Sequence, residues 1–346
     1  MDSTKKIMVT TRQIIALNEV KDCGASTIRQ IVSRSNQLNQ STLSDSELID
    51  FINDCLSEGI KRSRLKHLQK EDFYTAISYA DRIIEKSAKQ GIMAISYVDS
   101  LFPSRLLNTV NEEGKSDVPL ILYYKGNLDV ANLNSIAIIG TREPTREGVK
   151  AGEYFGEKLA ECGYNIVSGL ASGCDTAGHK GALKCPTGVT TAFLAHGLDS
   201  VYPQENELLA SEIVERGGLL MSEYPIGKTV NRYFLVARDR LQAALADATI
   251  VIQTGIHGGT NHAANTTLIA NKPLFCVKYG NDNLMNHEKV AGNRALVSKG
   301  AHYITSLDYE DLVDKYLNKQ VKCDAPNKNK EAAQPVELSL FPPEEI

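Results

Sequence analysis

Apolar residues recur every three or four positions through the first ninety residues of this 346-residue chain. This spacing is typical of amphipathic helices and predicts a small all-helical domain over residues 1–90. The apolar groups lie at 14–17, 28–32, 48–52 and 73–80. The turn between the first two predicted helices carries Gly24, as in helix-hairpin-helix motifs, where backbone N–H groups can contact a phosphate. Every helical hairpin needs such a turn, so an ordinary hairpin is the alternative interpretation.

Residues 61–70, KRSRLKHLQK, form a basic stretch with five Lys or Arg and no acidic residue. A run of like charges on a predicted helix usually faces solvent, and this is the first interpretation of the stretch. A stripe that contacts DNA is the second. The sequence alone leaves both interpretations open.

From residue 135 the pattern changes to short apolar runs that alternate with helical segments. This alternation predicts a mostly parallel sheet covered by helices on both faces, which is a Rossmann-like, doubly wound α/β fold. The runs are SIAIIG (135–140), NIVSG (165–169), VTTAFLA (189–195), GLLMSEY (218–224), ATIVIQT (248–254) and PLFCVKY (273–279). We expect this core to span residues 135–317, preceded by a connecting layer of short strands over 91–134. Residues 318–346 are polar, Pro- and Lys-rich and aperiodic, which predicts a disordered tail.

The composition adds three expectations. The net charge of −4 argues against a protein that is basic all over, so binding to a phosphate polymer would need local patches. The first residues lack the apolar core of a signal peptide, and no apolar run approaches the length of a membrane span, so we expect a cytoplasmic protein. The seven cysteines include no CxxC pair, which predicts reduced thiols, most of them in or near the core, without a disulfide framework or a zinc site.

Doubly wound sheets bind ligands at the carboxyl ends of their strands, where the strand order reverses. At the first strand end, Gly140 lets the backbone turn sharply, and Thr141 and Arg142 follow with a hydroxyl and a guanidinium. Together with free N–H groups at a helix start, these side chains suit an anionic oxygen. An ordinary strand-to-helix turn with a surface arginine is the alternative.

The second strand end reads NIVSGLASGCDTAGHKGAL over residues 165–183. Its small residues Ser168, Gly169 and Gly173 are expected to leave room for a ligand's sugar-phosphate chain beside the backbone amides. The spacing is not G-x-G-x-x-G, so no NAD is predicted. Three neighbours receive structural interpretations: Asp175 as a helix cap or loop brace, His179 as a packed residue, and Ser172 as no nucleophile because no nucleophile elbow is present.

The later strand ends also carry candidate residues. Asn206 is expected to cap the helix that follows it. Arg238 and Arg240 stand near Tyr233 and Phe234, a combination that can neutralise phosphates and stack a base of a single strand, although Phe234 fits a core position equally well. The glycine-rich stretch that ends in Gly259 and Thr260 is a further place where an anion can meet backbone amides.

Taken together, these motifs resemble the DNA-processing protein A family, also called Smf or DprA. The matching segments, in order, are IAIIGTR, IVSGLASGCDTAGHKGAL, HGLDSVYPQEN, LMSEYPIG, YFLVARDRLQAAL and IVIQTGIHGGTNHAANTTLIANKPLFCV. The resemblance implies a non-catalytic, cytoplasmic protein without a cofactor that binds and protects single-stranded DNA and helps to load the RecA recombinase. It also makes a homodimer plausible. The phosphate pocket that it implies is lined by Gly140, Thr141, Arg142, Ser168, Gly169 and the 173–175 turn, with Arg238 and Arg240 as the family's paired arginines.

Several positions depart from the family pattern. Asp239 replaces the usual Asn between the two arginines, Gln253 replaces a Glu, and Cys174 replaces an Ile. His257-Gly258-Gly259-Thr260 replaces a Ser-Gly-Ser/Thr segment. These differences lie in the region of the expected groove, so the sequence indicates a divergent member.

Two other functions have to be weighed. The wider superfamily contains nucleoside-monophosphate phosphoribohydrolases with a PGGxGTxxE motif, but their catalytic Glu would fall at about Ala263, and residues 248–281 contain no carboxylate. A sensor that binds a nucleotide without turning it over stays open. The helical domain and the basic stretch favour a DNA track, because a pocket for one nucleotide would explain neither.

The tail contains ELSLF at residues 337–341, which is similar to the pentapeptide that docks bacterial proteins on the replication sliding clamp. Leu338, Leu340 and Phe341 are the apolar anchors of such a motif. A tail that folds back onto its own domain is the alternative.

Overall fold

The protein is described by a computed structural model that covers residues 9–37, 42–307, 309–310 and 315–316. The expected clamp motif, with Leu338, Leu340 and Phe341, lies outside these described residues. The strands are β1 (Met93–Ser96), β2 (Ile121–Gly126), β3 (Ser135–Ile139), β4 (Asn165–Ser168), β5 (Thr190–Leu194), β6 (Leu219–Ser222), β7 (Ala248–Val251), β8 (Leu274–Val277) and β9 (His302–Ile304). They form one nine-stranded sheet in the order β1-β2-β6-β5-β4-β3-β7-β8-β9.

The sheet from β3 to β9 is parallel throughout and doubly wound. From β3 the chain adds β4, β5 and β6 on one side, and it then returns to add β7, β8 and β9 on the other. The strand order therefore reverses between β3 and β7, which are paired from Ile136↔Ala248 to Ile139↔Val251. The Rossmann-like prediction is confirmed, and the reversal point is where such folds bind ligands.

Residues 91–134 differ from the connecting layer that the sequence predicts. Their strands β1 and β2 form an antiparallel pair, and β2 also pairs antiparallel with β6, from Tyr123↔Ser222 to Gly126↔Leu219. Pairing of this kind satisfies backbone N–H and C=O groups along β6 that an edge strand would leave open. The segment thus extends the same sheet instead of forming a separate layer.

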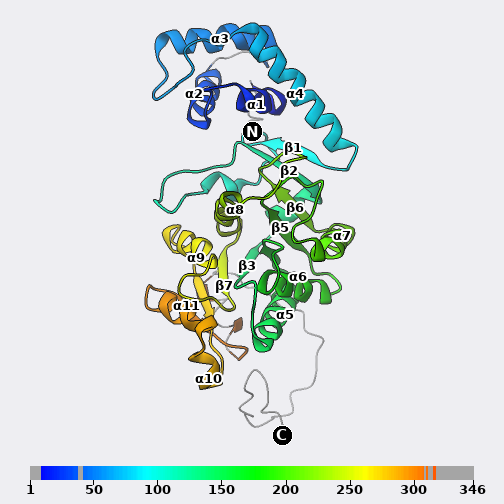
Figure 1. Cartoon of the computed structure of the whole chain (residues 1–346), viewed down its shortest axis with the longest axis vertical. Helices are drawn as coiled ribbons and strands as arrows, with labels where there is room; N and C mark the ends of the chain where they lie inside the picture. Colours follow the sequence, from blue (N-terminus) through cyan, green and yellow to red (C-terminus); the bar gives the residue numbers. More distant parts are fainter. Residues whose placement is uncertain (1–8, 38–41, 308, 311–314, 317–346) are drawn as a thin grey trace.

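Helices cover both faces of the sheet (Figure 1). Helices α5 (Arg146–Glu161) and α6 (Cys174–Lys184) pack on Ile136 and Ile138 of β3, whereas α8 (Arg232–Leu245) and α9 (Thr260–Ile269) pack on the face of Ala137 and Ile139. Alternate residues of a strand point to opposite faces, and since both faces of β3 are covered, all its residues are buried. The remaining helices here are α7 (Glu207–Glu215), α10 (Asp282–Met285) and α11 (Glu288–Val297), with 3-10 turns η1 (Ser104–Asn108), η2 (Leu128–Asn132) and η3 (Gln204–Asn206).

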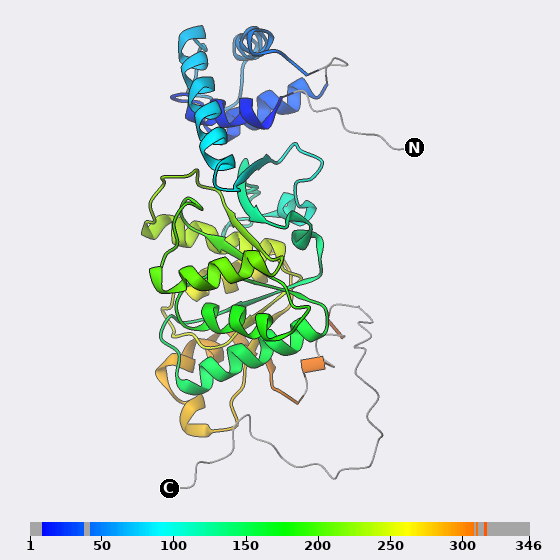
Figure 2. The same ribbon diagram turned by 90° about the vertical axis from the view of Figure 1, so that its right-hand side faces the viewer.

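The N-terminal helices lie beyond the β1 end of the sheet (Figures 1 and 2). They are α1 (Thr11–Glu19), α2 (Ala25–Ser35), α3 (Asp45–Glu58) and α4 (Lys70–Ala88). Two of them begin with capping boxes: Thr10 with Gln13 at α1, and Ser44 with Glu47 at α3. Their apolar faces share one buried cluster with Ile121 of β2, so the helices pack directly on the sheet.

Two sequence predictions about charge and cysteines can be checked in the fold. Of the basic stretch, residues 61–69 lie in the connection between α3 and α4, so only Lys70 stands on a helix, and the interpretation as a helix face is wrong. The six cysteines within the described residues are free, and all except Cys162 are buried. Among these residues no helix is both long and apolar enough to cross a membrane.

Candidate functional site

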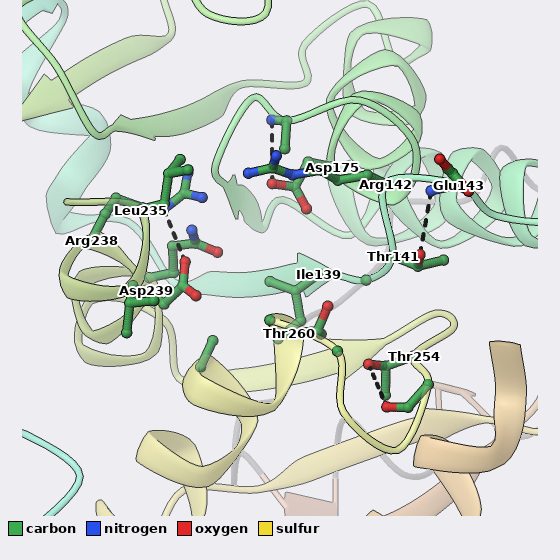
Figure 3. Close-up of a pocket in the computed structure, with 18 residues that line it drawn as sticks. Ile139, Thr141, Arg142, Glu143, Asp175, Leu235, Arg238, Asp239, Thr254 and Thr260 are labelled. Carbon is green, nitrogen blue, oxygen red and sulfur yellow. Dashed lines mark hydrogen bonds and ion pairs between the residues drawn. The ribbon is translucent and has the colours of Figure 1, made fainter. Parts of the chain in front are cut away.

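A cavity of about 370 Å³ opens at the carboxyl ends of β3 and β7, where the strand order reverses (Figure 3). Figure 3 shows Arg238 and Asp239 of α8 on one side of the pocket, Thr141 and Arg142 of the β3–α5 loop on another, and Thr260 between them. Seven residues that the sequence predicts for the site line this cavity together: Gly140, Thr141, Arg142, Asp175, Arg238, Gly259 and Thr260. The rule that ligands bind at strand ends thus located the pocket.

Arg142 is the available cation of this pocket. Its side chain is exposed and forms no ion pair or hydrogen bond within the described part of the chain. It also lines a smaller recess next to the main cavity, together with Tyr202. The loop that carries Arg142 is fixed at its base, because the Thr141 N–H donates a hydrogen bond to the Gln253 backbone oxygen at 2.7 Å. This hydrogen bond joins the chain after β3 to the chain after β7. Arg142 is therefore positioned to neutralise an anion in the pocket.

The N-terminus of α9 faces the same pocket. Its first residue, Thr260, and the preceding Gly258 and Gly259 all line the cavity, and no side chain caps this helix end. The N–H groups of Gly259 and Thr260 form no hydrogen bond within the described residues. Those of Gly258, Asn261 and His262 donate to the backbone oxygens of Gly255, Gly258 and Gly259. The two free N–H groups and the positive end of a helix dipole favour anions. A Cβ on Gly259 would meet nothing within 4 Å, so space for a ligand is open beside these amides.

Arg238 lines the pocket but is bound mainly to the protein itself. Its guanidinium donates to the backbone oxygens of Gly169 at 2.6 Å and Phe193 at 2.8 Å, and to the Asp239 carboxylate at 3.0 Å. A Cβ at position 169 would overlap this guanidinium, so Gly169 makes room for Arg238. The close approach at Gly169 is thus that of the protein's own arginine, and Gly169 lines the smaller recess with Arg142 instead of the main cavity; its contact with a ligand stays a prediction.

The other small residues of the 168–175 loop also serve internal contacts. Gly173 has φ +82°, and a Cβ there would lie 2.5 Å from the backbone oxygens of Thr141 and Arg142, so this glycine lets two loops touch. Ser168 is buried and donates to the Ile138 backbone oxygen at 2.6 Å. Ser168, Gly169 and Gly173 are not among the residues that line the main cavity.

Asp175 is the brace of this loop, as one of the sequence interpretations has it. Its Oδ2 accepts hydrogen bonds from the N–H groups of Gly169 at 3.1 Å and Ala171 at 3.4 Å. Burial raises the pKa of Asp175, while the charge of Arg238 and these N–H groups act against the rise. The Asp175 carboxylate holds the Gly169 N–H, and the Gly169 backbone oxygen accepts a hydrogen bond from Arg238. Gly169 thus links Asp175 to Arg238.

Arg240 points to a different place. Its guanidinium forms two hydrogen bonds to the Glu223 carboxylate, at 2.7 and 2.8 Å, and an ion pair with Asp117 at 2.6 Å. It does not line the cavity, and its side chain is only 11% exposed. The structure thus separates the two arginines that the sequence groups together: Arg238 stands at the pocket, and Arg240 ties α8 to Glu223 after β6 and to Asp117 before β2.

Three further sequence interpretations are settled by hydrogen bonds. Asn206 does not cap α7; its amide donates instead to the Leu170 backbone oxygen and the Thr176 hydroxyl, both at 2.9 Å. His179 is buried against Thr190, and burial lowers its pKa to about 3, so it is a neutral packing residue. The Ser172 hydroxyl donates to Glu205 at 2.6 Å and has no histidine partner, in agreement with the interpretation that it is no nucleophile.

Asp239 is the pocket residue whose role the sequence did not define. It lines the cavity beside Arg238, and burial raises the pKa of its carboxyl to about 6, against the opposing charge of Arg238. With Asp175 and Glu143 it gives three carboxylates in the wall against two arginines. Favourable contacts for an anion therefore concentrate at Arg142 and the α9 N-terminus, and the negative charge of Asp239 in the same wall opposes them. Within the described residues no cluster of His, Cys, Asp and Glu could hold a metal ion.

Comparison with known proteins finds relatives of this chain. Residues 93–316 match the family of DNA recombination-mediator protein A. The chain is 28% identical to the DNA processing protein DprA of Bacillus subtilis over 268 residues, which is 77% of this chain and 84% of that protein. It is 31% identical to Protein Smf of Escherichia coli over 176 residues, 51% of this chain and 45% of the relative, so it spans about half the length of that protein.

Two solved structures share the fold. DprA of Streptococcus pneumoniae aligns with a TM-score of 0.69 and 25% identity over 89% of this chain and 98% of that one. DprA of Helicobacter pylori, described as having a unique single-stranded DNA binding mode, aligns with a TM-score of 0.54 and 27% identity over 65% of this chain and 97% of that one. Since the family match covers more than half of its residues, the chain belongs to the DNA recombination-mediator protein A family, as its sequence motifs predict.

Proposed function

We propose that this protein binds single-stranded DNA at the pocket between β3 and β7 without chemically altering it. In the cell it would act in the cytoplasm, protect the strand and help to load the RecA recombinase. A homodimer and the replication sliding clamp are further proposed partners, the latter through Leu338, Leu340 and Phe341. No cofactor is part of this proposal.

One observation carries the DNA-binding part of the proposal. Arg142, without an ion-pair partner among the described residues, and the uncapped start of α9 line the same cavity. A guanidinium and free helix N–H groups both bind phosphate oxygens. The name given to the H. pylori relative supports DNA as the source of that phosphate.

An exposed aromatic side chain at the start of α8, the helix that also carries the lining residues Arg238 and Asp239, supports binding of a single strand. Tyr233 at the start of α8 is 68% exposed, and the Arg232 guanidinium lies over its ring at 4.9 Å from the centroid. Phe234 is half-buried and stacks on Tyr224 with 4.0 Å between ring centroids. Unpaired bases stack on aromatic rings with little regard to sequence. Of the two aromatic candidates, Tyr233 is thus the better platform.

The arrangement of carboxylates argues against a phosphoribohydrolase. Ala263, near the position expected for that enzyme's Glu, is buried in the cavity wall. Asp175 and Asp239 of the same wall are bound to backbone N–H groups and to Arg238. The third carboxylate of the wall, Glu143, is exposed and stands on the β3–α5 loop, so it does not occupy the α9 position where that enzyme's catalytic Glu would lie. Since the general acid or base of that enzyme has no counterpart at this α9 position, the wall favours binding over cleavage.

Replacement of Arg142 by alanine tests the proposal. Loss of one phosphate contact is expected to weaken binding of an oligo-dT strand about fivefold at about 0.1 M salt and to reduce the slope of log K against log salt by about 0.7. Fluorescence anisotropy across a salt series measures both quantities. Lys180→Ala, which removes an exposed charge from α6 outside the cavity, is the matched control and should behave like the wild type.

The same titration separates the alternatives. Equal salt slopes for the wild type and Arg142→Ala would reject a phosphate contact at this arginine. A free mononucleotide that displaces the strand at equal phosphate concentration would favour the nucleotide sensor instead. Co-purification of the DNA-bound protein with RecA tests the proposed partner.

A further inference from the structure

The connection between α3 and α4 presents a group of exposed cations that the pocket does not use. We call Lys61, Arg62, Arg64 and Lys66 the basic loop. All four side chains are exposed, and none forms a hydrogen bond or ion pair within the described residues. No acidic residue occurs between positions 59 and 70. Free cations gathered in this way produce a local positive field although the chain as a whole is acidic.

The basic loop is held in place at both ends by side-chain amides. The side-chain amide of Gln30 accepts a hydrogen bond from the Lys61 N–H at 3.0 Å and donates one to the Lys61 backbone oxygen at 2.9 Å. In the same way, the side-chain amide of Asn53 accepts a hydrogen bond from the Leu68 N–H at 2.7 Å and donates one to the Leu68 backbone oxygen at 3.1 Å. Between them the Leu65 N–H donates to the Asp22 backbone oxygen at 3.2 Å. The loop backbone is therefore fixed, so its cations extend from a fixed base.

A hollow of about 350 Å³ lies beside this loop, and it provides room for a ligand. Arg62 and Arg64 line one side, and Asp22 and Gly24 of the turn between α1 and α2, with Ser26 of α2, line the other. Arg62 has φ +59°, a conformation that is unusual for a residue other than glycine. Two arginines against one aspartate make this hollow favourable for an anion, and the elongated series of cations along the loop suits a chain of phosphates more than a single one.

We propose that the basic loop is a second contact site for the phosphate backbone of the DNA strand that the pocket binds. This inference rests on the proposed function. Five strand-to-strand steps separate β1, next to the N-terminal helices, from β3 at the pocket, which amounts to about 24 Å of sheet. A strand that reaches both sites must therefore be longer than one that fills the pocket alone.

The test compares oligo-dT strands of about three and about thirty nucleotides, using the full chain and the double variant Arg62→Ala/Arg64→Ala. The long strand should bind the variant about 25-fold more weakly at about 0.1 M salt, with a salt slope reduced by about 1.4, because two phosphate contacts are lost. The short strand should bind both proteins equally, which also shows that the variant is folded. Arg82→Ala/Lys86→Ala removes two exposed charges from α4 of the same N-terminal region and should change neither measurement.

Each outcome decides between the proposals. Equal binding of the long strand by the wild type and the Arg62/Arg64 variant would overturn the second site while leaving the pocket proposal intact. Failure of the wild type to bind either strand would reject both. Loss of binding to anionic lipid vesicles in the variant, with DNA binding unchanged, would assign the basic loop to a membrane surface and also overturn the inference.

Discussion

Replacing Arg238 by alanine is expected to lower the free energy of unfolding by about 3–5 kcal/mol, because it leaves buried carboxylates without their counter-charge. The Arg238 side chain is 6% exposed and bonds Asp239 and two backbone oxygens. Its charge also acts on buried Asp175. Urea unfolding followed by circular dichroism measures the loss. A change of this size would exceed what most surface substitutions cause.

Arg142→Ala is the matched control, because it removes the same kind of charge from an exposed position of the same pocket. Its unfolding free energy should stay within about 0.5 kcal/mol of the wild type. Equal stability of the Arg238 variant and the wild type would contradict the structural role. If the role holds, lost DNA binding in Arg238→Ala reports damage to the pocket wall, whereas lost binding in Arg142→Ala reports a missing phosphate contact.

Replacing Asp239 by asparagine is expected to tighten DNA binding about tenfold at pH 8. We take a unit charge about 6 Å from a phosphate and an effective dielectric constant of about 40. Removing that charge then changes the binding free energy by about 1.4 kcal/mol, which corresponds to about tenfold in affinity. The substitution removes one of three carboxylates from the pocket wall and preserves its shape. Oligo-dT anisotropy for the two proteins under the same salt conditions measures the difference.

The pH dependence of DNA binding by the wild type and by Asp239→Asn provides the control. Burial raises the pKa of Asp239 to about 6, so its negative charge is present at pH 8 and is lost as the pH falls through 6. Wild-type affinity should therefore rise as the pH falls from 8 to below 6, and the gap to Asp239→Asn should close. Arg238, Asp175 and His262 also influence this carboxyl, but they are present in both proteins. A gap that stays constant with pH would contradict the assignment to Asp239.

The position of the site could be predicted from the sequence because it depends on strand order alone. Parallel strands bring their carboxyl ends to one edge, so Thr141 after β3 and Thr260 after β7 line the same cavity although they are 119 positions apart. The prediction needed only the alternation of apolar runs and the rule on the reversal point. Membership of the family, which ordered motifs indicated, was confirmed over residues 93–316.

The roles of individual side chains could not be predicted, because they depend on partners far along the chain. Arg238 and Arg240 are two positions apart, yet one meets the Phe193 backbone oxygen and the other meets Glu223. Nothing local in the sequence separates them. Gly169 was expected to make space for a ligand, and the close approach that the structure shows there is that of Arg238, which arrives from 69 positions later. A glycine signals close approach without showing what approaches.

The antiparallel strands β1 and β2 were missed as parts of the main sheet for a similar reason. Their apolar runs are short, and pairing with β6 is decided by the free edge that the folded core presents. A helix face was one of the two interpretations of the basic stretch, but its Arg62 has a positive φ that a right-handed helix does not allow. Only the tertiary hydrogen bonds of Gln30 and Asn53 explain how these residues are held.

The most direct test of the central claim follows backbone amide signals of the full chain by two-dimensional NMR while a short oligo-dT strand is added. We expect the largest shifts at residues 141–143 and 258–260, since the β3–α5 loop and the start of α9 would bind the phosphates. Saturable binding that leaves both segments unchanged and shifts signals on another surface would contradict the claim that this pocket binds single-stranded DNA.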